Sequence, residues 1–581
     1  MNDRSTARRH GLAARLTDPH LIPHDVKPTM KHILFFLAAL CFSLNLWAQD
    51  SLDKLASNFW AWRAQYQPFS LDDIPRIERL LRMKRSWSTA SVGRQRADLA
   101  TFEARWKKLD ATRWPVAQQV DYRLMASALA RVHWELNLNR RWQRDPTLYL
   151  EQTLTPVLET LLSPPPIDEQ RSRELILRLR NIPAILEEAK STLSQPAAPF
   201  AKLASESVNN IRSQLQAFSR HVGAMLSGNT EELGASVEEA TRAFESYRVW
   251  LQQRLPAMTQ QTAVGREAYL YFLKNVALYP YSPEQLLAMG RQEWERSVAF
   301  EQMEHHRNRK IPELKMFASL DDQIKRTGEM EAEIRHFLVE QGILSVPDDF
   351  PHYTIRPIPA YVADLGGFAE FDDFTGPLRL DQNCVRWAPS PSDMLGYFAK
   401  ANARDPRPDI LHEGVPGHYM QLWLGWRNED TIRRHYYDSG ANEGLAFYVE
   451  EMMLQAGLFE DSPHSREIIY NFMRLRALRV EVDVKLALDE FTIDQAADYL
   501  VRMVPMDTGT ARSEAAMFAT TPGQAISYQT GKIQIMKFLA DARLHVGNKF
   551  DLKAFYDFLW RNGNVPIELQ RWEWFSEVRS Q

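Results

Sequence analysis

The sequence predicts a mainly α-helical protein with one small β-sheet, and three observations support this fold class. From about residue 51 to 290, and again after residue 392, apolar residues recur every three or four positions, as on the buried face of a helix. Between about residues 346 and 387, short alternations of β-branched and aromatic residues stand among Pro and Gly, which is typical of short strands. A chain of 581 residues can bury a large core.

The N-terminus indicates export. Lys31 and His32 begin a secretory signal, residues 33–46 form its apolar stretch, and Leu46-Trp47-Ala48 is a cleavage site before Gln49. Because Met30 directly precedes this signal, we interpret residues 1–29 as an extension of the gene model. We therefore expect five segments: extension 1–29, signal peptide 30–48, N-terminal helical region 49–290, connecting region with the sheet 291–400, and catalytic helical region 401–581.

We expect an exported, periplasmic protein that contains no internal disulfide. Cleavage after Ala48 leaves only Cys384, for which we expect a buried structural role. The bulky Leu40 before Cys41 disfavours lipidation of that thiol. The apolar stretch is too short for a comfortable membrane span, so no stable span is expected after cleavage.

Charge argues against a nucleic-acid partner. The net charge is -4, and no basic excess is present. We expect a small or neutral partner, and no oligomeric state is predicted.

The stretch LHEGVPGHYMQ, residues 411–421, resembles a zinc-protease motif with unusual spacing. The standard motif places two histidines four residues apart on one helix face. His412 and His418 are six apart, which on a regular helix separates them by about 120° and about 9 Å. One zinc ion could not bridge that gap, so either the stretch binds no metal or its helix is distorted.

Pro416 and Gly417 favour distortion. Asp409 after Pro408 is a suitable cap for a helix through His412. Pro416 then lies inside that helix, cannot donate to the carbonyl of His412 and collides with it, while Gly417 allows a bend. We therefore expect a broken or bulged helix that carries both imidazoles to one point. The alternative is that either histidine is an ordinary core residue.

A third ligand is expected on the helix that follows. Asn442 can cap a helix that ends near Gly457 and has Glu443 in its first turn. Without a metal, this carboxylate would still gain from the helix dipole. Glu450 and Glu451 are expected on a solvated or ion-paired face.

Four ordered motifs give the chain a resemblance to a known family. HEGVPGH, NEGLAFYVEE, TPGQAISYQTGK and FYDFLWRNGNVPIELQ are similar to signatures of the bacterial family called domain of unknown function 885, grouped with zincin-type metallopeptidases. The resemblance implies a large helical, gluzincin-like fold with a deep cleft beside the zinc-binding helix. It implies Zn²⁺ on His412, His418 and Glu443, with Glu413 as the catalytic carboxylate.

Tyr528 is the candidate donor to the oxyanion that forms when water attacks a carbonyl. Thr521-Pro522-Gly523-Gln524 has the form of a capping box, which predicts a helix that starts there and holds Tyr528 one turn further on. Gly531, on nearly the same face, would leave room for a substrate. Tyr528 could instead be a packing residue with its hydroxyl at the surface.

The remaining site candidates are weaker. Asp483 could orient a zinc-bound imidazole, although an ion pair with Arg479 on a helix surface is an alternative. Lys532 and Arg543 could receive a substrate carboxylate, and Gln421 is a further supporting candidate. Relatives carry Arg-Tyr before the Pro-Gly-Gln, where this chain has Met517-Phe518, so a grip on a free peptide terminus is not expected from that position.

We therefore predict an exported zinc peptidase that hydrolyses short peptides, with Glu413 as general base. Two alternatives stay open. A zinc amidase acting on a non-peptide amide would use the same residues, and a metal-free peptide-binding protein would not need Glu413.

Overall fold

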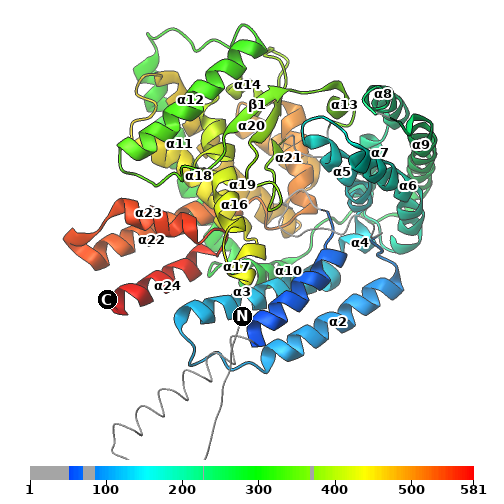
Figure 1. Cartoon of the computed structure of the whole chain (residues 1–581), viewed down its shortest axis with the longest axis horizontal. Coiled ribbons are helices and arrows are strands. Elements are labelled where there is room, and N and C mark those ends of the chain that lie inside the picture. The colour runs from blue at the N-terminus through cyan, green and yellow to red at the C-terminus, as the bar shows by residue number, and fades with distance from the viewer. Residues whose placement is uncertain (1–50, 70–84, 227, 367–371, 581) are drawn as a thin grey trace, which may run out of the picture. The chain divides into compact units, whose positions relative to one another are not determined.

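The computed structural model describes residues 51–69, 85–226, 228–366 and 372–580 and confirms a mainly helical protein with a small sheet (Figure 1). The expected extension and signal peptide lie outside these residues. Within them, no helix has the length and apolar character needed to cross a membrane.

The first part of the chain is helical, as predicted. Residues 51–66 form a helix. The helices that follow are α2 (Thr89–Lys107), α3 (Val116–His133), η1 (Trp134–Asn139), α4 (Arg141–Arg144), α5 (Thr147–Leu162), α6 (Glu169–Thr192), α7 (Ala198–Ser207), α8 (Ile211–Gly223), α9 (Thr230–Arg254), η2 (Leu255–Ala257), α10 (Arg266–Tyr271) and η3 (Phe272–Val276).

The middle of the chain adds long helices and the sheet. Its elements are α11 (Pro283–Asn308), α12 (Leu320–Glu340), β1 (Tyr353–Pro357), α13 (Ala360–Ala363), β2 (Asp372–Asp373), β3 (Cys384–Ala388) and α14 (Tyr397–Asn402). The strand order is β1-β3-β2, with β1 parallel and β2 antiparallel to the central β3. Cys384 on β3 is fully buried, as expected. The predicted border after residue 290 falls inside α11, so a continuous helix crosses it.

The last part of the chain is helical again. Its elements are α15 (Arg407–Asp409), η4 (Ile410–Gly414), α16 (His418–Trp426), α17 (Thr431–His435), α18 (Ser439–Gln455), α19 (Pro463–Ala487), α20 (Ile493–Met503), α21 (Thr508–Thr520), α22 (Ser527–Val546), η5 (Gly547–Lys549), α23 (Leu552–Arg561) and α24 (Ile567–Ser580).

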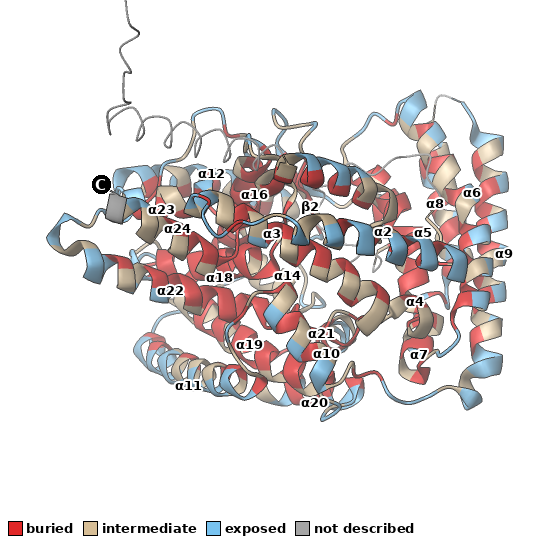
Figure 2. Cartoon of the chain, turned by 90° about the horizontal axis from the view of Figure 1, so that it is seen from below, coloured by how far each residue is buried: buried red, intermediate tan, exposed pale blue. Residues whose placement is uncertain are grey.

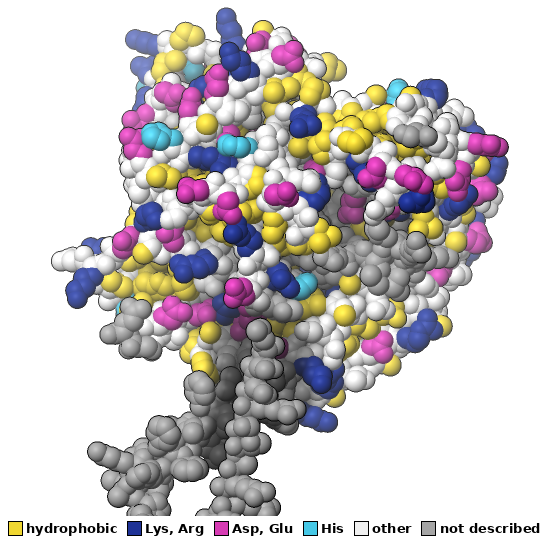
Figure 3. All heavy atoms as spheres, in the orientation of Figure 1, with side chains coloured by type: hydrophobic (Ala, Val, Ile, Leu, Met, Phe, Trp, Pro, Cys, Tyr) yellow, Lys and Arg dark blue, Asp and Glu magenta, His cyan; other side chains and the backbone are white. Residues whose placement is uncertain are grey.

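Helices α18 and α19, within the C-terminal helical region, are deeply buried. Figure 2 shows α18 almost wholly and α19 mostly in the buried colour, whereas α9 and α11 expose much of their outer faces. Acidic and basic side chains are mixed over the face in Figure 3, in keeping with a net charge near zero. The buried helices therefore form the scaffold for any site between them.

Three glycines let α18 and α22 touch. A Cβ on Gly444 would lie 2.4 Å from the Cα of Gly531, and a Cβ on Gly531 would lie 1.9 Å from the carbonyl oxygen of Gly440. Only glycine permits such contact between backbones. The expectation that Gly531 leaves room for a substrate is therefore wrong, because α18 occupies the space beside it.

Candidate metal centre

The helix through HEGVPGH is broken between its histidines, as predicted. His412 lies in η4, a single turn of π-helix, and His418 is the first residue of α16. Between them Val415 is extended, and the peptide bond before Pro416 is cis. A Cβ on Gly417 would lie 2.0 Å from the carbonyl oxygen of His412, so this close return of the chain requires glycine.

A hydrogen bond from a distant segment supports the turn. The indole Nε1 of Trp560 on α23 donates to the carbonyl oxygen of Pro416 at 2.7 Å. The prediction that Asp409 caps this helix is wrong, because its side chain makes no cap hydrogen bond. Its carboxylate accepts hydrogen bonds from the Tyr353 hydroxyl at 3.1 Å and the Asn402 amide at 2.8 Å, because α15 has already begun before it.

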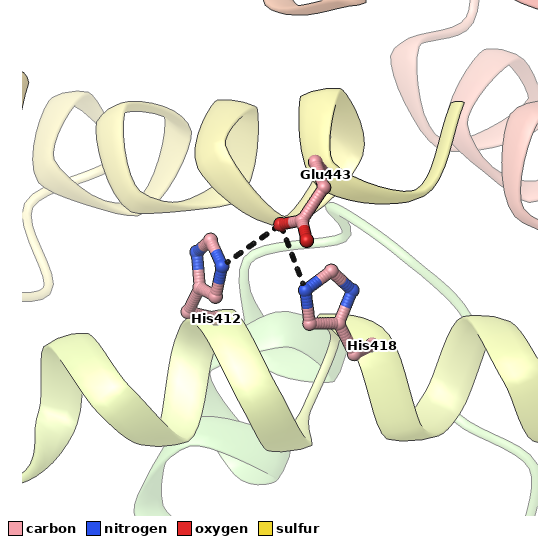
Figure 4. Close-up of side chains that lie close together, drawn as sticks. All are labelled: His412, His418 and Glu443. Atoms are coloured by element: carbon pink, nitrogen blue, oxygen red, sulfur yellow. Dashed lines mark hydrogen bonds and ion pairs between the residues drawn. The ribbon is translucent and has the colours of Figure 1, made fainter. Parts of the chain in front are cut away.

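The turn brings three potential metal ligands together (Figure 4). The Oε2 atom of Glu443 on α18 lies 3.2 Å from Nε2 of His418 and 3.5 Å from Nε2 of His412. One ligand atom from each residue lies within 4.8 Å of the other two. Tetrahedral zinc with bonds of about 2.1 Å would separate its ligand atoms by about 3.4 Å, so this donor set fits zinc in both chemistry and spacing.

Glu450 hydrogen-bonds to the imidazole of His412 on the side that faces away from Glu443. His412 Nδ1 donates to Glu450 Oε1 at 2.7 Å, which directs Nε2 toward Glu443. The same oxygen lies 2.9 Å from Nη2 of Arg476, and both Glu450 and Arg476 are buried. A carboxylate behind a metal-bound imidazole fixes the tautomer and the orientation of the ring.

The second histidine lacks such a partner. Nδ1 of His418 is buried and has no hydrogen-bond partner among the described residues. Its ring meets the ring of Phe374 edge-on, with centroids 6.3 Å apart. On the Nδ1 side, packing against Phe374 therefore replaces the carboxylate that His412 has.

Electrostatics favour an ionised Glu443. Burial alone would raise the pKa of the Glu443 carboxyl, but the charge of His418 and the hydrogen bonds from His412 and His418 together hold it well below its usual value. For His412, burial and Arg476 lower the pKa, and the hydrogen bonds to Glu443 and Glu450 outweigh them and raise it. A metal ion would take the place of these protons.

Glu413 lies beside the ligands and faces a cavity. Its side chain is 20% exposed, and Oε1 lies 3.8 Å from Nη1 of Arg386 on β3. Arg386 also pairs with Asp372 at 2.8 Å and with Asp409 at 3.3 Å. The small sheet therefore lies next to the candidate general base, as the fold prediction placed it.

Tyr528 also lies at the site, although its helix begins later than predicted. Residues 521–526 form turns, Gly523 has a φ of +95°, and α22 starts at Ser527 without a capping box. The Tyr528 ring stacks on that of His412 with centroids 6.3 Å apart. The Arg479 guanidinium lies 4.5 Å from the same ring.

The carboxylate of Asp483 holds these turns in place, so neither role predicted for Asp483 is correct. It is fully buried, and its carboxylate accepts hydrogen bonds from the amides of Gly523 and Ala525 and from the Tyr269 hydroxyl, at 2.8–3.0 Å. Burial raises its pKa to about 6. Arg479 pairs with Glu514 instead, at 2.7 Å.

The helix that carries Glu443 starts earlier than predicted. Its cap is Asp438, which accepts from the Ala441 amide at 2.7 Å. Asn442 lies within the helix and donates to Gln421 at 2.7 Å. Glu450 and Glu451 are ion-paired as expected but buried rather than solvated.

Three weaker candidates lie away from the cavity. Gln421 is fully buried and donates to the carbonyl oxygens of Ala441 and Gly563, both at 3.1 Å. Lys532 is fully buried and pairs with Glu451. Arg543 is exposed in the last turn of α22. None of the three lines the cavity beside Glu413, so their predicted contact with substrate has no geometric support.

The cavity next to the candidate metal centre has a volume of about 950 Å³. Residues from α5 and α7 of the N-terminal region line it together with residues from α12, the sheet, α14, α15, η4, α18, α19, α21 and α22. His412, Glu413, Glu450 and Tyr528 all line it. A substrate in this cavity would therefore contact the candidate ligands and the candidate base together.

Sequence reasoning missed Glu450, Arg476 and Arg386. Glu450 ends the E-G-x-A-x-Y-x-E pattern, and its separation of seven residues from Glu443 places both on one helix face, which was an available signal. Arg476 and Arg386 lie on α19 and β3, and only the tertiary fold brings them to the site.

The fold and this cluster define a mainly helical protein with a candidate centre of two histidines and one glutamate. The chain belongs to the family described as "Bacterial protein of unknown function (DUF885)", whose model matches residues 81–572. A search of curated proteins finds no match.

Two solved structures are similar to this chain at 18% sequence identity and a TM-score of 0.66. One is described as a "putative lipoprotein of unknown function" from Shewanella oneidensis, with 92% of this chain and 99% of that chain covered. The other is a "putative lipoprotein" from Colwellia psychrerythraea, with 93% and 99% covered. Similarity at this identity establishes the fold.

Proposed function

We propose that the protein is a zinc-dependent hydrolase that cleaves peptide bonds of short peptides. The convergence of His412, His418 and Glu443, whose ligand atoms lie within 4.8 Å of one another, carries this proposal. Two imidazoles and one carboxylate, next to a cavity, are typical of catalytic rather than structural zinc. The resemblance to helical gluzincin-type peptidases supports the same conclusion.

Zinc in this centre would supply a Lewis acid and lower the pKa of a water molecule toward neutrality. Glu413 follows a ligand directly in the chain and faces the cavity, so its carboxylate would accept the proton of the attacking water and deliver it to the leaving amine. Tyr528 would donate its hydroxyl proton in a hydrogen bond to the oxygen of the attacked carbonyl. Arg386 would hold the Glu413 carboxylate toward the substrate.

The shape of the cavity favours small substrates. Its volume of about 950 Å³ lies near the upper end of ordinary ligand pockets, and helices line both of its sides. Such a space would admit an extended oligopeptide and exclude a folded protein. We take it to be the deep cleft that the family resemblance implies.

We also propose that the protein is exported to the periplasm. The signal pattern at residues 30–48 supports export. Both similar structures carry the description "putative lipoprotein", and lipoproteins are exported, so these descriptions are consistent with the proposal.

The experiment combines metal analysis of the purified protein with cleavage of a mixed peptide library. Wild type should contain close to one zinc per chain and cleave peptides. Glu413→Gln should keep its zinc and lose activity by roughly 10²–10⁴-fold. Glu340→Gln, the same change on an exposed site of α12, should resemble wild type.

Each other outcome selects another function. Zinc binding with hydrolysis of only non-peptide amides would indicate an amidase. Peptide binding without zinc would indicate a binding protein. Unchanged activity in Glu413→Gln would exclude the proposed base.

A further inference from the structure

We propose that Phe398, Phe472 and Met517 form a subsite for a large apolar side chain on one of the two residues that the scissile bond joins. This inference rests on the proposed peptidase function and names its substrate class. All three residues line the cavity, on α14, α19 and α21. They are therefore brought together only in the folded protein.

The subsite lies close to the candidate metal centre. The rings of Phe398 and Phe472 pack with centroids 5.5 Å apart. The guanidinium carbon of Arg476 lies 5.3 Å from the Phe472 ring, and Nη2 of the same arginine lies 3.4 Å from Nδ1 of His412. The guanidinium group of Arg476 thus neighbours both the aromatic pair and a candidate zinc ligand.

A second arginine, Arg479, lies between the subsite and Tyr528 in the same way. The guanidinium carbon of Arg479 lies 4.5 Å from the ring of Tyr528 and 5.7 Å from the ring of Phe398. A side chain attached next to a carbonyl carbon between Tyr528 and Glu413 would therefore have these rings as neighbours. The subsite is adjacent to the reacting bond rather than remote along the peptide.

The charges near the subsite are already balanced. Arg476 is paired with Glu450, and Arg479 forms two hydrogen bonds to Glu514. Neither arginine offers its full charge to an acidic side chain. Arg512 on the same cavity wall is exposed, but it lies more than one helical turn before Met517.

The apolar surface of the subsite is open to a ligand. Phe398 and Met517 are only partly buried, although both pack against a core cluster. Ala516 beside Met517 also lines the cavity and adds to its apolar surface. Covering such surface with a large apolar group is favourable, whereas a small or charged side chain would leave it wet or lose its own hydration.

The test is a cleavage profile of the zinc-loaded wild type on a peptide library, read by mass spectrometry. We expect Phe, Leu, Met or Tyr at one of the two positions flanking the cut. For matched peptides, replacement of that residue by Gly or Asp should lower kcat/KM by roughly tenfold or more. In Glu413→Gln, the same replacements should weaken peptide binding, which measures the subsite without turnover.

Variants of Met517 and Phe398 test whether these residues form the subsite. Met517→Arg should reduce the apolar preference roughly tenfold and improve peptides with an acidic residue at that position, while zinc content stays at wild-type level. Met303→Arg places the same change on the outer face of α11, where the side chain is 62% exposed, and should leave the profile unchanged. Phe398→Ala supplies a second test if Met517→Arg does not fold.

The outcomes separate the two proposals. Absence of any peptide cleavage by zinc-loaded protein would overturn the proposed function. Cleavage without preference at either flanking position, or a profile that Met517→Arg and Phe398→Ala both leave unchanged, would overturn the subsite alone.

Discussion

Glu450 Oε1 lies 2.7 Å from His412 Nδ1, on the side of the imidazole that faces away from Glu443. One helix thus provides both a potential metal ligand and the carboxylate that orients another ligand. Because this hydrogen bond sets which nitrogen is free to bind metal, its loss should affect metal affinity before it affects anything else.

Glu450→Gln should therefore weaken zinc binding about 10–100-fold. The amide can still contact His412, but it accepts less strongly and no longer balances Arg476. Competition with a chelator would measure the affinity, with Glu340→Gln as the exposed control. Wild-type affinity in a correctly folded Glu450→Gln variant would contradict an orienting role.

Gly417→Ala should disrupt the turn between the histidines. A Cβ 2.0 Å from the carbonyl oxygen of His412 cannot be accommodated without moving one of the ligands. We expect a loss of about 3 kcal/mol or more in the free energy of unfolding, and little bound zinc. Urea denaturation and metal analysis measure both effects.

Gly328→Ala is the matched control for that variant. It lies within α12, and a Cβ there would meet nothing within 4 Å. Alanine at this site should stabilise the helix by about 1 kcal/mol. If Gly417→Ala and Gly328→Ala changed the free energy of unfolding and the zinc content equally, a steric collision at residue 417 would not be the cause of the change.

Tyr528→Phe should lower kcat by roughly 10²–10³-fold and leave zinc content and KM nearly unchanged. The phenyl ring keeps its stacking on His412, so only the hydroxyl is lost. Steady-state kinetics give the separation of kcat from KM. Tyr271→Phe, on the half-buried ring at the end of α10, should have no effect, and an equal decrease there would count against an oxyanion donor.

Asp438→Asn should change how stability depends on pH. Burial raises the pKa of the Asp438 carboxyl from 3.8 to about 7, although the Ala441 amide and Arg131 lower it. Between these two values the folded chain keeps a proton that the unfolded chain has lost, so the carboxyl destabilises the fold increasingly as pH rises.

Asparagine also caps helices but does not titrate. The variant should therefore gain stability relative to wild type between pH 4 and pH 8, by up to about 4 kcal/mol at about 1.4 kcal/mol per pKa unit. Urea denaturation at both pH values measures this. A difference that stays constant with pH would show that Asp438 does not titrate in this range.

The local parts of the site could be predicted from the sequence. Pro416 and Gly417 act on the backbone of their own helix, so the break in HEGVPGH followed from chemistry within seven residues. The extents of the helical regions and the position of the sheet were also predictable, because residue periodicity reflects burial.

Choices between equivalent local signals were less predictable. Asp438 and Asn442 are both good caps, and the structure uses the earlier one. The Thr521-Pro522-Gly523-Gln524 stretch has a capping pattern, but the amides of Gly523 and Ala525 donate to the Asp483 carboxylate, about 40 residues away, and hold it as turns. Long-range contacts overrode the local preference in that case.

Partners across the fold could not be predicted. His412 and Glu450 are 38 residues apart, and Arg476 lies a further 26 beyond Glu450. Nothing in the local pattern near Arg386 indicates that it faces Glu413, because a strand and a distorted helix turn must first pack together.

The backbone contact between α18 and α22 has a mechanical consequence. Gly444 and Gly531 leave no layer of side chains between these helices, so neither can slide or tilt without a collision. Glu443 on α18 and Tyr528 on α22 are therefore held at a fixed separation. Adjustment of the cavity to substrates of different width would then come from its other lining elements, such as α5 and α7.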